Sequence, residues 1–241
     1  MLAAAENSSI RYYLLETYYL RNGDQGSRLA EWLREGLLPA CARLKVPGPR
    51  FVLEGLVAAH MPQVACLTPY ASLEEMTVSR AKLRADASCR AAFEKWEAGA
   101  EAPYEEYAEH LLETTSYCPP PPADTPADQK PRVFELRLYH SPTERQLKAL
   151  HERFAGPEIK IFHRVGVHPV LYSSTAVGPH KPNLVYLTPF ADLAAREKAW
   201  AAFGADPEWI KVRKESIERS GQISSVIQIS LYRAAAYSPV R

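Results

Sequence analysis

The chain lacks the features that mark most membrane proteins and most readily recognised enzymes. No apolar run approaches the roughly 18 to 20 residues that a bilayer span requires. No G-x-S-x-G, G-x-G-x-x-G or P-loop motif occurs. The four cysteines form no CxxC, and no two histidines have the helical i, i+4 spacing of a metal site. We therefore expect no metal and no cofactor, and no motif identifies a reaction.

Net charge is also scarce. A formal charge of +1 on 241 residues provides no electrostatic reason to expect nucleic acid or an anionic membrane as a partner. The hydrophobic content of 46% and the charged content of 24% are typical of a soluble globular protein. We expect free, mostly buried thiols, a small molecule or a protein as partner, and possible homodimers.

The small residues at the start of the chain, Met1 to Asn7, resemble the region around a signal-peptidase site but lack the charged and apolar regions before it. We expect a cytoplasmic location. Export to the periplasm, with a trimmed signal and a possible disulfide, is the alternative.

An internal repeat is the most informative feature that the chain does contain. The string LTPYASL, from Leu67, returns 120 residues later as LTPFADL, from Leu187. The same spacing relates His60 to His180 and Tyr117 to Tyr237, each followed by a proline two residues on. Matches in one register over half the chain indicate a fold that is present twice.

A proline-rich segment separates the two copies. It begins at Cys118-Pro119 and ends at Pro131, and it is unable to form a helix or an interior strand. We expect residues 1–118 to form a first, divergent repeat, residues 119–131 to form a stiff surface linker, and residues 132–241 to form the second repeat.

Hydrophobic periodicity predicts the same order of elements in each copy. In the second half, strands are expected at 133–140, 169–175, 183–187 and 225–233, with helices between them. In the first half, strands are expected at 11–20, 51–58, 63–67 and 110–117. The order β-α-β-β-α-β predicts an α+β protein of two ferredoxin-like repeats, each an antiparallel sheet with helices on one face. We expect the two sheets to pack face to face as an intramolecular dimeric α/β barrel.

The alternation of the fifth strand predicts the lining of that barrel. If Phe134, Leu136 and Leu138 face the helices, then Glu135, Arg137 and Tyr139 face the interior. An offset of 119 residues relates Glu16 to Glu135, which adds Glu16 and Tyr18 to the lining. The last strand adds Gln228, Ser230 and Tyr232 if its aliphatic residues face the helices.

Three interpretations of this lining stay open. The favoured one is that Glu135 and Arg137 pair with charges across the two sheets and fix how the halves dock, because a buried charge must be paired. The second is a polar cavity that orients a small ligand. The third is catalysis without a cofactor, as in an oxygenase or isomerase, with Glu16, Glu135 or His163 as base and Arg137 stabilising an oxyanion.

Several segments of the second half resemble the NIPSNAP family. They are VFELRLY (133–139), EIKIFHRVG (158–166), VGPHKPNLVYL (177–187), KAWAAFGADPEW (198–209) and AYSPVR (236–241). The first half keeps YYLLETYYLRNG (12–23) but has Ala87-Ser88-Cys89 where the second has Pro207-Glu208-Trp209. The chain is thus similar to tandem, two-repeat bacterial members.

The resemblance implies a dimeric α/β-barrel fold, related in shape to cofactor-free oxygenases and to haem-binding barrel proteins. It carries over no catalytic residues, because the family has no settled activity. Relatedness of fold alone is a weak argument for function. We expect a non-catalytic binding module, with a cofactor-free enzyme as the alternative and a haem-binding protein, with His163 as the ligand, as the second alternative.

Overall fold

The computed structural model describes residues 10–126 and 128–241. The export alternative depends on residues 1–9, which lie outside the described residues. Within the described part of the chain, no helix is long and apolar enough to cross a membrane.

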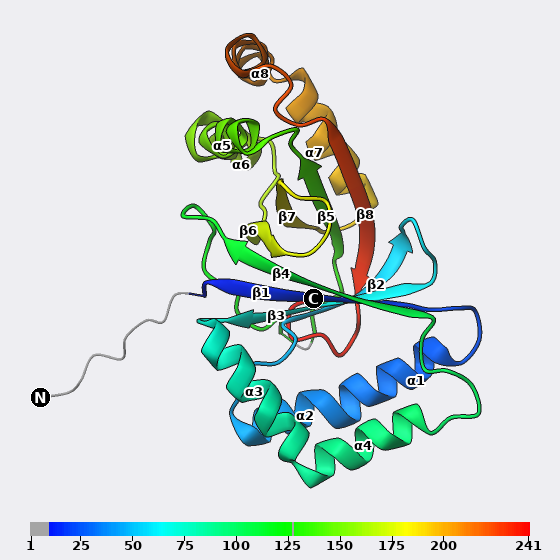
Figure 1. The fold of residues 1–241 in the computed structure, drawn as a ribbon. Coiled ribbons are helices and arrows are strands. Elements are labelled where there is room, and N and C mark those ends of the chain that lie inside the picture. Colours follow the sequence, from blue (N-terminus) through cyan, green and yellow to red (C-terminus); the bar gives the residue numbers. More distant parts are fainter. Residues whose placement is uncertain (1–9, 127) are drawn as a thin grey trace, which may run out of the picture.

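Among the described residues, eight strands and eight α-helices follow one another in the same order in both halves (Figure 1). The strands are β1 (Tyr12–Tyr19), β2 (Phe51–Val57), β3 (Gln63–Tyr70), β4 (Glu106–Thr114), β5 (Val133–His140), β6 (Leu171–Val177), β7 (Asn183–Phe190) and β8 (Val226–Ala234). The helices are α1 (Gln25–Glu31), α2 (Leu38–Leu44), α3 (Leu73–Ala85), α4 (Ala87–Glu97), α5 (Glu144–Arg153), α6 (Ile159–Arg164), α7 (Leu193–Ala205) and α8 (Pro207–Ser220). π-Helical segments, Trp32–Leu37 and Phe154–Glu158, join α1 to α2 and α5 to α6.

Side-chain caps explain where several of these helices begin. Ser72 and Asp192 accept hydrogen bonds from backbone N–H groups three residues on and start α3 and α7. Asp86 and Asp206 cap α4 and α8 in the same way. The predicted positions of most strands agree with the structure, but β4 begins four residues earlier than the sequence pattern indicated.

The eight strands close into one antiparallel barrel in the order β1-β3-β2-β8-β5-β7-β6-β4. Strands β1 to β4 are neighbours of one another, as are β5 to β8. The two sets join where β2 pairs with β8 and where β4 pairs with β6. Helices α1 to α4 cover the outer face of the first set, and α5 to α8 that of the second (Figure 1). The fold is thus α+β with a closed antiparallel barrel.

Apolar side chains from both halves fill the barrel centre. Phe51 and Phe134 meet there with ring centroids 5.8 Å apart, and both are fully buried. Tyr13, Leu15 and Leu138 belong to the same cluster. The prediction that Phe134, Leu136 and Leu138 face the helices, and that Glu135, Arg137 and Tyr139 face the interior, is therefore wrong.

The physical reason lies in what surrounds each face. The barrel centre is enclosed by strands on all sides, so apolar side chains gain most by filling it. In the layer between sheet and helices, Arg196 and Trp200 of α7 provide partners for the carboxylate of Glu135. The last strand was predicted in the correct register: Gln228 lies opposite Leu138 and Tyr232 opposite Phe134, on the inward face.

Candidate functional site

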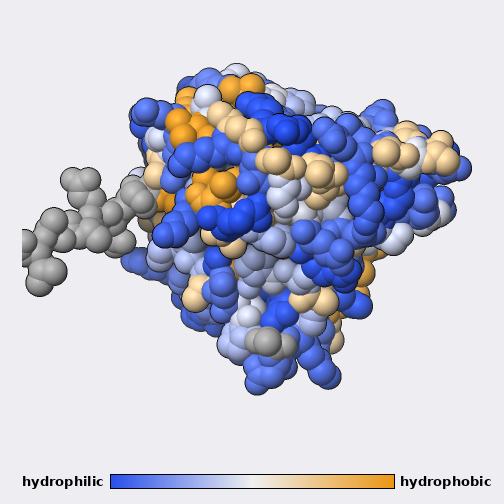
Figure 2. Space-filling model, turned by 90° about the horizontal axis from the view of Figure 1, so that it is seen from below, coloured by the Kyte–Doolittle hydropathy of each residue, from blue (hydrophilic) through white to orange (hydrophobic). Residues whose placement is uncertain are grey.

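A cavity of about 560 Å³ lies between the outer face of the first sheet and the helices that cover it. Glu16 and Tyr18 of β1 form part of its floor, and α2, α3 and α4 contribute its walls. Figure 2 views the molecule from the side of these helices and shows apolar residues gathered in one part of that face, surrounded by hydrophilic ones. The volume of the cavity is in the range of small-molecule sites.

Aromatic rings make up one wall of the cavity. Trp96 stacks on Trp32 with centroids 6.1 Å apart and meets the ring of Tyr18 edge-on, also at 6.1 Å. Tyr104 and Tyr107 continue this wall. Such a wall suits a planar apolar ligand, because aromatic faces pack best against flat groups.

Two carboxylates face each other on the floor of the cavity. Glu16 of β1 and Glu109 of β4 are directly opposite partners in the strand ladder, an arrangement that is unfavourable for like charges. The Tyr107 hydroxyl lies 2.7 Å from a carboxylate oxygen of each. Arg80 of α3 forms an ion pair with Glu109.

The hydrogen-bond count indicates where a proton resides. The Tyr107 hydroxyl has one proton and can donate to only one carboxylate, so its second short contact requires a proton on a carboxyl. Burial raises the pKa of Glu16. For Glu109, burial acts in the same direction, but hydrogen bonds from Arg80 and Tyr107 outweigh it and lower the pKa. Of the two carboxyls, Glu16 therefore holds a proton more firmly than Glu109.

Further polar groups lack partners in the described part of the chain. The indole N–H of Trp96 is buried and has no hydrogen-bond partner there, although a buried tryptophan usually finds one. Arg84 also lines the cavity and forms no ion pair with another described residue. A ligand with a negative charge would pair with Arg84.

The corresponding space in the second half is filled by aromatic rings. Phe162, Tyr186, Trp200 and Phe203 pack together there, with Phe162 and Phe203 centroids 4.8 Å apart. Trp209 adds a further ring, 4.3 Å from Phe203. The two halves therefore share their element order but differ in this layer.

Cysteines stand in the first half where three of these rings stand in the second. Cys66 lies opposite Glu16 in the strand ladder of the first half. Tyr186, 120 residues further on, lies opposite Arg137 in the ladder of the second half. Cys89 donates its backbone N–H to Asp86 as Trp209 does to Asp206.

Cys41 and Phe162 likewise each accept the backbone N–H five residues on. The cavity exists because thiols occupy the places of rings. All four cysteines are free, and Cys41, Cys66 and Cys89 are buried.

Glu135 lies in the helix layer of the second half and is fully buried. Arg137 and Arg196 both form ion pairs with it, and the indole N–H of Trp200 donates to it at 3.0 Å. The Arg137 guanidinium also stacks on Trp200, 3.7 Å from the ring centroid. These partners all come from the second half, so the predicted pairing across the two sheets is wrong.

The ladder also corrects the equivalence of the two halves. Glu16 matches Arg137, and Leu14 matches Glu135, because their partners in β3 and β7 are 120 residues apart. The offset of 119 used for Glu16 is therefore wrong by two positions. The parity of the strand is unaffected, so Glu16 and Tyr18 share the helix-facing side with Glu135, and the prediction that they face the barrel interior is also wrong.

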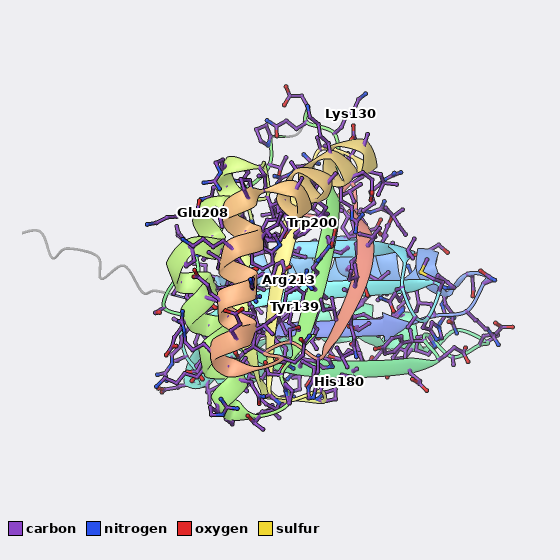
Figure 3. All side chains as sticks on the ribbon, turned by 90° about the horizontal axis from the view of Figure 1, so that it is seen from above. Lys130, Tyr139, His180, Trp200, Glu208 and Arg213 are labelled. Atoms are coloured by element: carbon purple, nitrogen blue, oxygen red, sulfur yellow. The ribbon has the colours of Figure 1, made fainter. Side chains whose placement is uncertain are left out.

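The other predicted site residues lie apart from the cavity. Tyr139 lines a smaller hollow of about 210 Å³ beneath α8, beside Arg213 (Figure 3). His163 is exposed on α6 and stacks on His168. Gln228 is exposed, and Tyr232 is buried in the barrel, where Gln63 donates to its hydroxyl at 2.5 Å. The described residues contain no cluster of three metal-ligating side chains.

Sequence reasoning missed Arg80, Trp96 and Tyr107. Arg80 lies on a helix with little amphipathic signal, and Tyr107 lies before the predicted start of β4. The repeat carried a usable signal, because Cys66 and Cys89 lie 120 residues before Tyr186 and Trp209.

Solved structures with a similar fold cover nearly the whole chain. A candidate monooxygenase from Fusobacterium nucleatum is 6% identical with a TM-score of 0.57, over 94% of this chain and 93% of that chain. One from Lactobacillus acidophilus is 10% identical with a TM-score of 0.54, over 93% and 94%. An anthrone oxidase-like protein is 13% identical with a TM-score of 0.54, over 93% and 91%. At these identities the similarity concerns the fold alone.

No curated protein compared with the chain gives a match. The NIPSNAP family model matches residues 134–239. This range contains most of the segments on which the sequence resemblance depended. Residues 134–239, most of the second half of this chain, thus carry the match to the NIPSNAP family.

Proposed function

We propose that this protein binds a small planar molecule with an acidic group in the cavity of its first half. The observation that carries the proposal is the aromatic wall of the cavity, formed by Tyr18, Trp32, Trp96 and their neighbours. The unpaired Arg84 adds a positive charge, which suits a carboxylate, sulfonate or phenolate.

We also propose that the chain is a tandem of two ferredoxin-like repeats, residues 1–118 and 132–241, joined by the segment 119–131. The common element order and the common neighbour order of the strands support this division. In this arrangement the second repeat is a filled scaffold that closes the barrel. The first, divergent repeat has exchanged core rings for a binding cavity.

The test uses 8-anilino-1-naphthalenesulfonate, which combines a planar, apolar naphthalene ring system with an anionic sulfonate. Cys89→Trp introduces the residue that stands at the equivalent place of the second half, and its ring would occupy the cavity. We expect this variant to lose most of the fluorescence enhancement of the dye. Cys89→Ser is the matched control, because it removes the thiol and leaves the space.

The dye also binds exposed apolar surface. Ile229→Lys, which removes part of such a surface on β8 away from the cavity, therefore provides a second control. Circular dichroism checks that each variant is folded. Equal dye binding by Cys89→Trp and Cys89→Ser would contradict the proposal.

A second candidate is cofactor-free proton transfer at the same site. The shared proton between Glu16, Tyr107 and Glu109 favours it, because a carboxyl with a raised pKa is suited to acid–base work near neutrality. Anthrone suits the test, since one similar structure is an anthrone oxidase-like protein. We expect deuterium exchange at the anthrone methylene to be faster with the protein than with Glu16→Gln. Equal rates would leave the binding role alone.

A further inference from the structure

Strand β8 has a hydrogen-bonding edge that is only half used. On one side it pairs with β5 along its length, from Val226 to Arg233. On the other side it pairs with β2 from Ala234 back to Leu231, where the pairing ends. Among the described residues, no strand continues this pairing beyond Leu231. The first five residues of β8, Val226 to Ser230, thus form a free edge.

The ladder shows which backbone groups point outward along this edge. The N–H of Ala234 donates to the carbonyl of Arg132 on the β5 side. In an antiparallel pair, residues alternate between the two sides. The even-numbered residues of β8 therefore bond towards β5, and Ile227 and Ile229 direct their N–H and C=O groups to the free edge.

The side chains at this edge are apolar and uncharged. Val226, Ile227 and Ile229 are 50%, 49% and 42% exposed. No charged residue occurs from Ser220 to Tyr232, in a chain in which 24% of the residues are charged. Natural edge strands are usually protected by charges, prolines or bulges. This edge has none of these from Val226 to Ser230.

The first half contains a matched comparison. Strand β4 has an equivalent free edge, because its pairing with β6 begins only at Leu111. The residues 120 positions before Val226, Ile229 and Ser230 are Glu106, Glu109 and His110. The free edge of β4 therefore carries charged side chains, whereas the equivalent edge of β8 carries none.

We propose that the free edge of β8 pairs with the same edge of a second copy of this chain. An antiparallel register centred on Gln228 places Ile227 opposite the partner's Ile229. This is a hydrogen-bonded pair on both sides of the twofold axis, so all outward N–H and C=O groups of these residues are satisfied.

The absence of charge on this edge favours a second copy of the chain as partner over an unrelated strand that carries positive or negative charges. Two neutral segments meet without like-charge repulsion, and the β-branched Ile227 and Ile229 form favourable cross-strand pairs. The equivalent pairing of two β4 edges would place glutamates close together. The exposed Val57, 61% accessible on the neighbouring β2, extends the apolar surface.

A cysteine at the twofold axis tests the register. Gln228 lies opposite itself in a pair without mutual hydrogen bonds, for which the Cα atoms are about 4.5 Å apart, within disulfide range. We expect Gln228→Cys to give at least about tenfold more disulfide-linked dimer on mild oxidation than Ser230→Cys, because position 230 faces the partner's residue 226. Both variants carry the same native thiols, so the background is matched.

Sedimentation velocity tests the association itself. We expect the wild-type chain to dimerise at micromolar concentration and Ile229→Lys to stay monomeric. Ile217→Lys, the same change at a 40% exposed site on α8, serves as the control and should dimerise like the wild type. A monomeric wild-type chain, or equal cross-linking of the two cysteine variants, would overturn the proposal. Neither outcome bears on the cavity.

Discussion

Glu158 is a buried acid that takes no part in the proposed site. It lies at the end of the second π-helical segment, 1% exposed, and accepts a hydrogen bond of 2.6 Å from Arg153. Burial raises its pKa to about 7, and the pairing with Arg153 opposes this only in part. Its protonation is therefore coupled to folding in the physiological range.

The pH dependence of stability follows from this coupling. Between pH 4.5 and about 7 the native state keeps a proton that the unfolded state has released. Folding stability should therefore fall as the pH rises through this window, by an amount on the order of 3 kcal/mol. Glu158→Gln has no such proton, so its stability relative to the wild type should rise over the same window.

Urea unfolding at a series of pH values measures this difference, and the exposed Glu152→Gln serves as the control. Parallel pH profiles for the wild type and Glu158→Gln would contradict the assignment.

Helices α2 and α6 show how one element can either fill or open a layer. Both follow a π-helical segment and both pack on the outer face of a sheet. Phe162 of α6 is fully buried among Tyr186, Trp200 and Phe203. Cys41 of α2, at the equivalent place, borders the cavity. The difference lies in the side chains and not in the backbone.

Reciprocal substitutions at this pair should therefore have unequal costs. Phe162→Cys leaves a hole in a filled layer and should destabilise the protein by about 3 kcal/mol. Cys41→Phe places a ring into existing space and should cost less than about 1 kcal/mol. Chemical denaturation of both variants compares them directly. Equal costs would mean that the first half has no free space for a ring at position 41.

The barrel makes the two halves one structural unit. Each sheet presents an apolar face that water would reach if the halves separated, and Phe51 and Phe134 meet at the centre of this contact. The largest apolar cluster draws its members from both halves. A disturbance at this contact should therefore be felt throughout the chain.

Phe134→Ala should lower the free energy of unfolding by about 3 to 5 kcal/mol. Hydrogen exchange should become faster in the strands of both halves, because their opening is shared. Ile210→Ala, at a 55% exposed position on α8, is the control and should change stability by less than about 0.5 kcal/mol. Faster exchange confined to residues 132–241 would show that the halves open independently.

The amino-acid sequence by itself determined the repeat, the strand and helix order, and the resemblance of the second half to NIPSNAP. These properties depend on local periodicity and on the comparison of one half with the other, and both are visible in a linear string. Placing β4 was harder, because its early residues Glu106 to His110 carry no alternating apolar signal.

Only the tertiary structure decided which face of each strand packs against the helices and which packs against the other sheet. Alternation in β5 separates Glu135 from Phe134 but does not say which side meets the other sheet. That choice depends on how two apolar faces bury each other, a contact between residues more than 80 positions apart. The cavity has the same origin, since it arises where rings are absent from a layer that several distant elements build together.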